Sequence, residues 1–161
     1  MATIVSAPAN LIVGKVDGID IRFVGVEFNV DFPSCPGHPQ GGRGARIKTD
    51  GIRGEETFRR DQQFLQAFEE WGNKRRGPNP ELAGEPPTMP AIPVLERVQV
   101  TLTDDVGTLY RRVAGQVAGT STEWDAAWTY APTPPDTADT LTVRFILDDE
   151  ATGAECQIRI D

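Results

Sequence analysis

Apolar and polar residues alternate along residues 94–161, and this pattern limits the possible folds more than any other feature of the chain. Successive side chains of a β-strand point to opposite faces of the sheet, so a period of two indicates strands that bury one face. Turn residues separate the alternating runs, as they do in β-sandwiches and barrels. The sequence therefore predicts a mainly β fold. The five strands expected in this part are residues 97–103, 109–117, 124–130, 141–147 and 156–160.

A change of parity interrupts a similar alternation in residues 11–32. Apolar residues occupy odd positions up to Phe23 and even positions from Val24 to Phe32. One extra residue is needed if both sets are to face the same core, which predicts a β-bulge or sharp bend near Gly25. A long strand bent in this way can serve both sheets of a sandwich.

Residues 33–90 form a Pro- and Gly-rich excursion that holds eight of the thirteen Pro and nine of the sixteen Gly. Much of it is therefore expected to be irregular. Within it, residues 55–71 predict an amphipathic helix that ends at Gly72. We expect this helix to dock on a sheet, because an isolated helix of this length is marginal and its aromatics would leave an apolar patch. Its apolar residues are Phe58, Phe64, Leu65, Phe68 and Trp71.

The length and charge of the chain bound its class. With 161 residues we expect a single β-sandwich domain over residues 1–161, with the helix-containing insertion at about 33–90. The net charge of −8 disfavours nucleic-acid binding. No run of residues is apolar enough to span a membrane, and the N-terminus lacks the features of a signal peptide. The expected location is cytoplasmic, with Cys35 and Cys156 as reduced thiols.

Basic residues gather in one part of this acidic chain. Residues 41–76 contain nine basic and six acidic residues, a net charge of +3 that leaves −11 for the rest. The run GGRGARIK is interpreted as a flexible loop with a basic surface. The basic residues expected to contact a protein partner, together with the helix, are Arg43, Arg46, Lys48, Lys74, Arg75 and Arg76.

A longer pattern spans residues 104–141: a D-x-x-G-x-x-Y turn, a glycine-containing loop, a tryptophan, and an aromatic-x-P-x-P-P run before A-x-x-L. Its residues are Asp105, Gly107, Tyr110, Gly115, Gly119, Trp124, Trp128, Tyr130, Pro132, Pro134, Pro135, Ala138 and Leu141. The pattern resembles that of uncharacterised bacterial, often actinobacterial, immunoglobulin-like domains. The resemblance implies an immunoglobulin-like β-sandwich, whose fold hosts many unrelated roles. Such relatives are often secreted or membrane-anchored, whereas this chain has no recognisable export signal.

Cys35 and His38 form a C-x-x-H pair that could contribute two ligands to a zinc site. A structural zinc needs four ligands, and only Cys156 remains as a further cysteine, with no other histidine. A Cys35 nucleophile with His38 as its base is also conceivable, but no third group that would orient the imidazole is identifiable. A loop cysteine and a solvated histidine are the favoured interpretation. Carboxylates in the turns near residues 104–105 and 148–150 are expected to cap backbone N–H groups.

Trp124, Trp128 and Tyr130 share one face of a predicted strand. They could stack on a sugar, but we interpret them as sandwich core. The sequence thus favours a non-catalytic interaction or structural module that contacts a protein partner or a second copy through residues 33–90. No cofactor, metal or enzymatic activity is expected. The alternatives left open are a small-ligand or glycan-binding domain and a Cys35-dependent enzyme or metal-binding protein.

Overall fold

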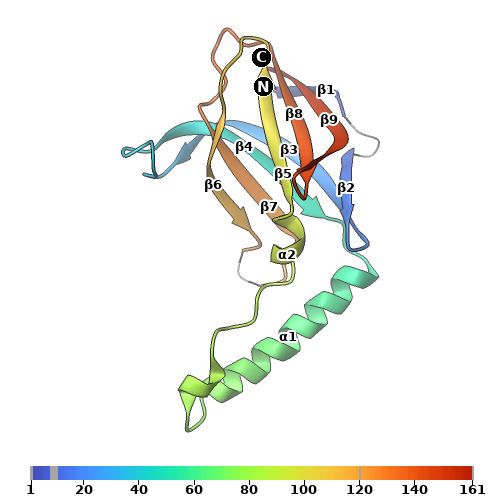
Figure 1. The fold of residues 1–161 in the computed structure, drawn as a ribbon, viewed down its shortest axis with the longest axis vertical. Helices are drawn as coiled ribbons and strands as arrows, with labels where there is room; N and C mark the ends of the chain where they lie inside the picture. Colours follow the sequence, from blue (N-terminus) through green and yellow to red (C-terminus); the bar gives the residue numbers. More distant parts are fainter. Residues whose placement is uncertain (1, 8–10, 120, 161) are drawn as a thin grey trace.

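The computed structural model describes residues 2–7, 11–119 and 121–160, and it confirms a mainly β fold (Figure 1). One sheet has the strand order β1-β9-β8-β5 and the other the order β2-β3-β4-β7-β6, with neighbouring strands antiparallel in both. The strands are β1 (Ala2–Ser6), β2 (Ile12–Val16), β3 (Ile19–Phe32), β4 (Gly42–Gly51), β5 (Val98–Asp104), β6 (Arg111–Val117), β7 (Asp125–Ala131), β8 (Thr140–Leu147) and β9 (Glu150–Ile160).

The two sheets face each other across a shared hydrophobic core. Phe23 of β3 and Phe145 of β8 come from different sheets, and their ring centroids are 5.7 Å apart. Tyr130 of β7 donates its hydroxyl proton to the backbone oxygen of Val100 in β5 at 3.1 Å. These contacts join the sheets as two packed layers, in which the alternating residues of the sequence supply the inner faces.

β3 contains the irregularity that the parity change predicts. Its register against β4 shifts between Phe23 and Gly25, and Phe23 is fully buried while Val24 is 47% exposed. The predicted bulge is therefore confirmed. A second shift surrounds Asn29, whose φ of 56° lies in the left-handed region. The bend does not carry β3 into the second sheet, because β3 lies between β2 and β4 of one sheet.

β4 lies inside the range that the sequence assigned to the irregular excursion. It is the middle strand of the five-stranded sheet, between β3 and β7. Ala45, Ile47 and Thr49 point into the core with the period of two of a strand, and all three are buried. The expected insertion over residues 33–90 is thus too broad. Residues 33–41 connect β3 to β4, and the longer segment outside the sheets is residues 52–91.

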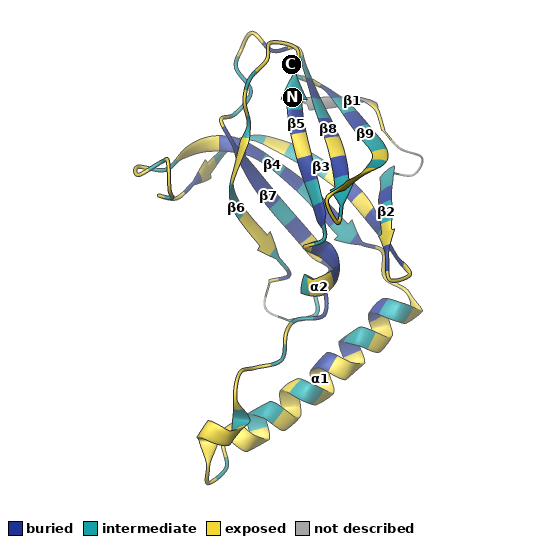
Figure 2. Cartoon of the chain, in the orientation of Figure 1, coloured by how far each residue is buried: buried dark blue, intermediate teal, exposed yellow. Residues whose placement is uncertain are grey.

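Residues 52–91, here called the arm, project from one end of the sheets (Figure 1). The helical elements of the arm and of its return are α1 (Glu55–Arg75), η2 (Pro80–Ala83) and α2 (Ile92–Leu95). Gly72 lies within α1, so the expectation that it ends the helix is wrong. Figure 2 shows buried positions of α1 in the half nearer the sheets and exposed positions towards η2. The chain re-enters the core at Ala91, Val94 and Leu95, which have no exposed surface.

Local turn signals are weaker guides to strand pairing than to strand position. The prediction that residues 97–103 and 109–117 pair as a hairpin is wrong, because β5 and β6 belong to different sheets. The turn between them does place Gly107 at a φ of 80°, as its sequence indicates. β8 and β9 form a hairpin through Asp148 and Asp149, which both have positive φ, as a type I′ turn requires.

Candidate interaction site

Thr57 fixes the first turn of α1. The Gly54 backbone N–H donates to the Thr57 hydroxyl oxygen at 2.8 Å, and that hydroxyl donates to the Gly54 carbonyl oxygen at 3.0 Å. Thr57 is buried, so this turn lies against other parts of the chain. Glu55 and Glu56 occupy the same turn, where the positive end of the helix dipole favours carboxylates. The start of the helix is therefore defined by both hydrogen bonding and charge.

A buried hydrogen bond fastens the second turn of α1 to the sheets. Trp124, immediately before β7, donates its indole N–H to Asp61 Oδ1 at 2.8 Å. Asp61 Oδ2 also lies 3.6 Å from Arg53 Nη1. Trp124 and Asp61 are both buried. The base of the arm is thus tied to the core, and the rest of α1 extends away from it.

The far half of α1 packs on the returning chain and η2. Trp71 donates its indole N–H to the Gly84 backbone oxygen at 3.1 Å. The rings of Phe64, Phe68 and Trp71 follow one another with centroid distances of 5.7 and 5.5 Å. The expectation that the helix docks across a sheet is wrong. The chain leaves and re-enters the sheets at the same end, and α1 is contacted by η2 at its far end (Figure 1).

An apolar strip stays exposed on α1. Phe58, Leu65 and Phe68, which we call the apolar strip, are 65%, 45% and 46% exposed. At 3.6 residues per turn they fall along one side of the helix. Phe64 is buried on the neighbouring side, and Trp71 is partly buried. Of the four aromatic residues predicted to contact a partner, Phe58 and Phe68 are therefore the most available.

Charges on α1 are paired near its start and unpaired near its end. Glu56 accepts hydrogen bonds from Arg59 and Arg60, which hold its pKa at about 2. Arg60 also lies 3.4 Å from Asp17. The basic residues at the C-terminal end of α1, Lys74, Arg75 and Arg76, make no ion pair with a described carboxylate. No helix in the described ranges combines the length and apolar character needed to cross a membrane.

The basic residues before the helix lie on a strand. Arg43, Arg46 and Lys48 are part of β4, so the interpretation of this run as a flexible loop is wrong. Arg43 lies 3.3 Å from Asp31, and Arg46 lies 3.5 Å from Glu27, which also pairs with Lys48. The Lys48 hydrogen bond lowers the Glu27 pKa. β3 therefore neutralises these charges, which makes them a weaker contact surface than the end of α1.

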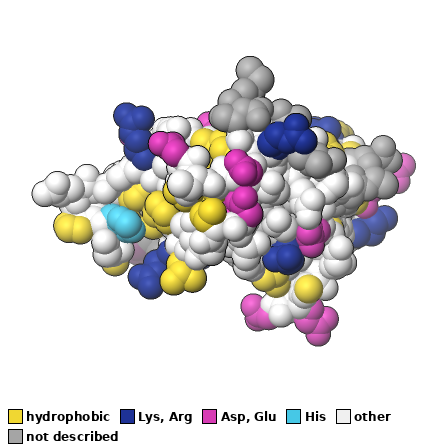
Figure 3. Space-filling model, turned by 90° about the horizontal axis from the view of Figure 1, so that it is seen from above, with side chains coloured by type: hydrophobic (Ala, Val, Ile, Leu, Met, Phe, Trp, Pro, Cys, Tyr) yellow, Lys and Arg dark blue, Asp and Glu magenta, His cyan; other side chains and the backbone are white. Residues whose placement is uncertain are grey.

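Cys35 and His38 lie in the loop that connects β3 to β4, where they form an isolated antiparallel bridge with each other. The Cys35 N–H donates to the His38 backbone oxygen at 3.1 Å, and the His38 N–H donates back at 2.9 Å. The His38 ring packs edge-on against Phe32, with centroids 5.2 Å apart. Cys156 is buried in β9, and the described residues contain no group of three His, Cys, Asp or Glu suited to a metal. Figure 3 shows the one histidine on a protruding tip, with basic and acidic side chains interspersed elsewhere on that face.

The aromatic residues of β7, and Trp124 immediately before it, are core residues. Trp124, Trp128 and Tyr130 are 3%, 5% and 6% exposed. The Arg112 guanidinium covers the Trp128 ring at 5.2 Å from its centroid, and Gly115 lies against the same ring. The core interpretation is confirmed, and these rings present no open face on which a sugar could stack.

The acidic turn before β6 caps backbone groups, as expected. Asp104 accepts hydrogen bonds from the N–H groups of Val106 and Thr108, both at 3.0 Å, and from the Tyr110 hydroxyl at 2.8 Å. Partial burial acts to raise the Asp104 pKa, but hydrogen bonds from Thr108, Tyr110 and Val106 outweigh it and hold the pKa at about 2. Asp105 bonds to the Asp139 N–H at 2.9 Å. These carboxylates stabilise turns.

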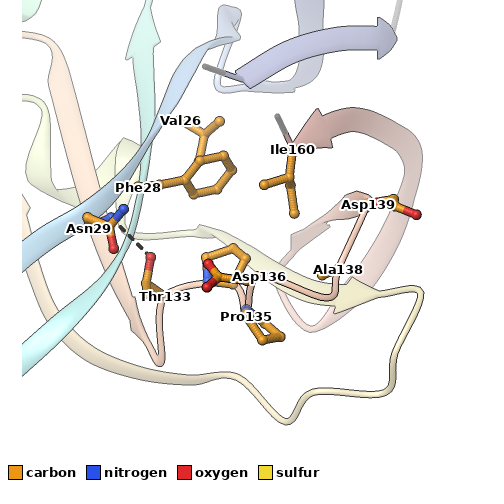
Figure 4. Close-up of a pocket in the computed structure, with 10 residues that line it drawn as sticks. Val26, Phe28, Asn29, Thr133, Pro135, Asp136, Ala138, Asp139 and Ile160 are labelled. Atoms are coloured by element: carbon orange, nitrogen blue, oxygen red, sulfur yellow. Dashed lines mark hydrogen bonds between the residues drawn. The ribbon is translucent and has the colours of Figure 1, made fainter.

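A cleft of about 610 Å³ lies between β3 and the segment that leads into β8 (Figure 4). The Asn29 N–H donates to Thr133 Oγ1 at 3.0 Å at its edge. The lining residues include no basic residue, thiol or imidazole. They are Val26, Phe28, Asn29, Thr133, Pro134, Pro135, Asp136, Ala138, Asp139 and Ile160. In Figure 4 the Asp139 carboxylate points away from the other side chains, so the polar groups do not converge on one point.

Comparison with protein-family models, with curated proteins and with solved structures found no match. The function must therefore be inferred from the geometry of the chain itself. Among the described residues, nine large apolar side chains are exposed, and three of them make up the apolar strip on α1. Since single exposed apolar residues are normal and aligned ones mark contact surfaces, the apolar strip is the best candidate site.

Proposed function

We propose that the chain is a non-catalytic interaction module and that the apolar strip of α1 is its protein-contact surface. The observation that carries this proposal is the exposure of Phe58, Leu65 and Phe68 on a helix that projects from one end of the sheets. Exposed apolar area costs free energy that burial recovers, at about 25 cal/mol per Å². A helix with apolar anchors on one side suits a partner that offers a complementary groove or helix.

The two ends of α1 support this proposal because they limit its movement. The Trp124–Asp61 hydrogen bond holds the base, and the Trp71–Gly84 hydrogen bond holds the far half. A contact element that is already ordered loses less conformational entropy on binding. The cations at the end of α1, which pair with no described carboxylate, add a polar rim to the apolar strip, the usual anatomy of a protein interface.

The proposal includes an immunoglobulin-like architecture. What supports it is the packing of two antiparallel sheets around one core, together with the turn and proline pattern of residues 104–141. The strand order differs from that of immunoglobulin constant domains, in which the sheets are ABED and CFG. Here the first strand, β1, lies beside the last strand, β9. The proposed likeness is therefore one of layered architecture and does not extend to strand order.

Partner capture from the native cell lysate tests this function. The full chain is compared with Leu65→Glu, which puts a charge in the apolar strip, and with Gln63→Glu, which adds the same charge on another side of α1. We expect the wild type and Gln63→Glu to retain the same protein, and Leu65→Glu to lose it by about tenfold or more. Self-association that shows the same dependence also supports the proposal. Identical capture and association by all three proteins would overturn it.

A further inference from the structure

We infer that the partner is a second copy of this chain, with the two α1 helices antiparallel and a two-fold axis beside Leu65. This inference rests on the proposed function and names the occupant of the apolar strip. Leu65 is the midpoint of the 21-residue helix, and it lies midway between Phe58 and Gly72 and between Glu55 and Arg75. A two-fold axis at Leu65 therefore brings the two members of each pair together across the interface. By symmetry each contact occurs twice in the dimer.

When two α1 helices pair antiparallel, acidic residues near the start of one helix face basic residues near the end of the other. Glu55 of one copy faces Arg75 of the other. Glu55 and Arg75 are exposed, and neither makes an ion pair with a described residue of its own chain. Arg75 stays close to the helix, because its guanidinium lies 5.3 Å from the Trp71 ring centroid. Both charges are thus positioned for an intermolecular pair.

A parallel pairing would lose this complementarity. Glu55 would face Glu55 of the second copy, Arg75 would face Arg75, and like charges at facing positions are destabilising. The sheets of both copies would also meet at the same end of the helices. In the antiparallel order they lie at opposite ends, because the sheets stand at the Glu55 end of α1 (Figure 1).

The apolar strip fits the same arrangement. Leu65 and Phe68 of the two copies lie around the axis and form the centre of the contact. Phe58 faces Gly72, which has no side chain of its own. The Arg76 guanidinium lies beside Gly72, with Nη1 3.2 Å from the position of an added Cβ. An arginine guanidinium favours the face of an aromatic ring, so Phe58 meets a small residue and a cation together.

The small size of the apolar strip sets the kind of dimer to expect. Three apolar side chains from each copy form an interface at the lower end of specific protein contacts. We therefore expect a reversible monomer–dimer equilibrium. Sedimentation equilibrium of the full chain, with a reductant and over a wide concentration range, measures it directly.

Substitutions in the apolar strip test the interface. Leu65→Glu brings two carboxylates together beside the axis and is expected to raise the dissociation constant by about tenfold or more. Gln63→Glu adds the same charge away from the apolar strip and leaves the constant unchanged. Equal unfolding free energies of the three proteins show that the fold is kept. If wild-type protein is monomeric at every concentration, the inference is overturned.

A charge swap tests the antiparallel order. Glu55→Lys and Arg75→Glu each replace two attractive pairs by two repulsive ones, and each is expected to raise the dissociation constant by about three- to tenfold. The double variant Glu55→Lys/Arg75→Glu makes the pairs attractive again and restores the wild-type value. If the double variant has a dissociation constant no lower than those of the single variants, the antiparallel order is overturned.

The outcomes separate this inference from the proposed function. A monomer that still captures another protein through the apolar strip keeps the proposed function and removes the second copy as partner. A dimer that Leu65→Glu does not weaken removes the inference, and the lysate experiment then decides the proposed function. A monomer that captures nothing through the apolar strip removes both.

Discussion

Trp124 donates its indole N–H to Asp61 Oδ1 at 2.8 Å, and this buried bond joins the core of the sheets to the projecting helix. Trp124 is 3% exposed and Asp61 is 8% exposed, so water does not replace the bond easily. The two residues are 63 positions apart in the chain. Their contact fixes where α1 leaves the sheets and hence where the apolar strip is presented.

Removing the acceptor tests this attachment. Asp61→Ala leaves the Trp124 indole N–H buried without a partner, and we expect the free energy of unfolding to fall by about 1–3 kcal/mol. Urea denaturation followed by tryptophan fluorescence measures the change. Asp61→Asn is the matched control, because its amide oxygen still accepts the bond, and it should lose clearly less. Equal losses in the two variants would show that the hydrogen bond contributes little.

The strands were predictable because their signal is local. A period of two located β5, β7 and β8 within a few residues and the second half of β9, and the parity change located the bulge at Gly25. Pairing partners were not predictable in the same way. Whether β5 pairs with β6 or with β8 depends on contacts far along the chain, and the turn between β5 and β6 fits either outcome.

The close contact between Gly115 of β6 and the Trp128 ring of β7 gives a second prediction. A Cβ at Gly115 would lie 2.5 Å from Trp128 Cε3, while the Arg112 guanidinium covers the same ring. Gly115→Ala must therefore shift the ring, and we expect it to lower the free energy of unfolding by about 1–3 kcal/mol. Gly25→Ala is the strand control, since nothing lies within 4 Å of its Cβ. A similar loss for both would mean that glycine flexibility, and not the Trp128 contact, explains the effect.

The turn carboxylate Asp104 gives a pH dependence. Its pKa is about 2 in the folded chain, below the ordinary value of 3.8, so folding favours its ionised form. The stability it contributes is therefore present above about pH 4 and is lost as the pH falls through about 2. Asp104→Asn removes this titration, while Glu56, with a similar pKa, remains in both proteins.

Urea denaturation of wild type and Asp104→Asn between about pH 6 and pH 2 measures the dependence. We expect the stability difference between them to shrink steadily over the lower part of that range. A difference that stays constant with pH would contradict the role of the Asp104 charge. It would leave the hydrogen bonds to Val106 and Thr108 as neutral contacts that the amide reproduces.

The residues of the apolar strip could be predicted from the sequence, but their exposure to solvent could not. The periodicity of residues 55–71 identified Phe58, Leu65 and Phe68 as one apolar surface. The expectation of docking assumed that such a surface is buried within its own chain. In the structure the side that carries Phe64 and Trp71 is buried or partly buried, and Trp71 donates a hydrogen bond to Gly84 of the returning chain. Which side a return segment covers depends on its path, which Pro and Gly residues do not specify.

The two thiols give the last prediction. Cys35 is partly exposed and Cys156 is fully buried, and burial raises the Cys156 pKa to about 11. A thiolate-specific disulfide reagent at about pH 8 should therefore label one thiol per native chain and two per unfolded chain. Cys35→Ser should leave no reactive thiol in the native protein and one after unfolding. Unreactive thiols in unfolded, unreduced wild type would instead indicate a disulfide, which contradicts the two free cysteines of the structure.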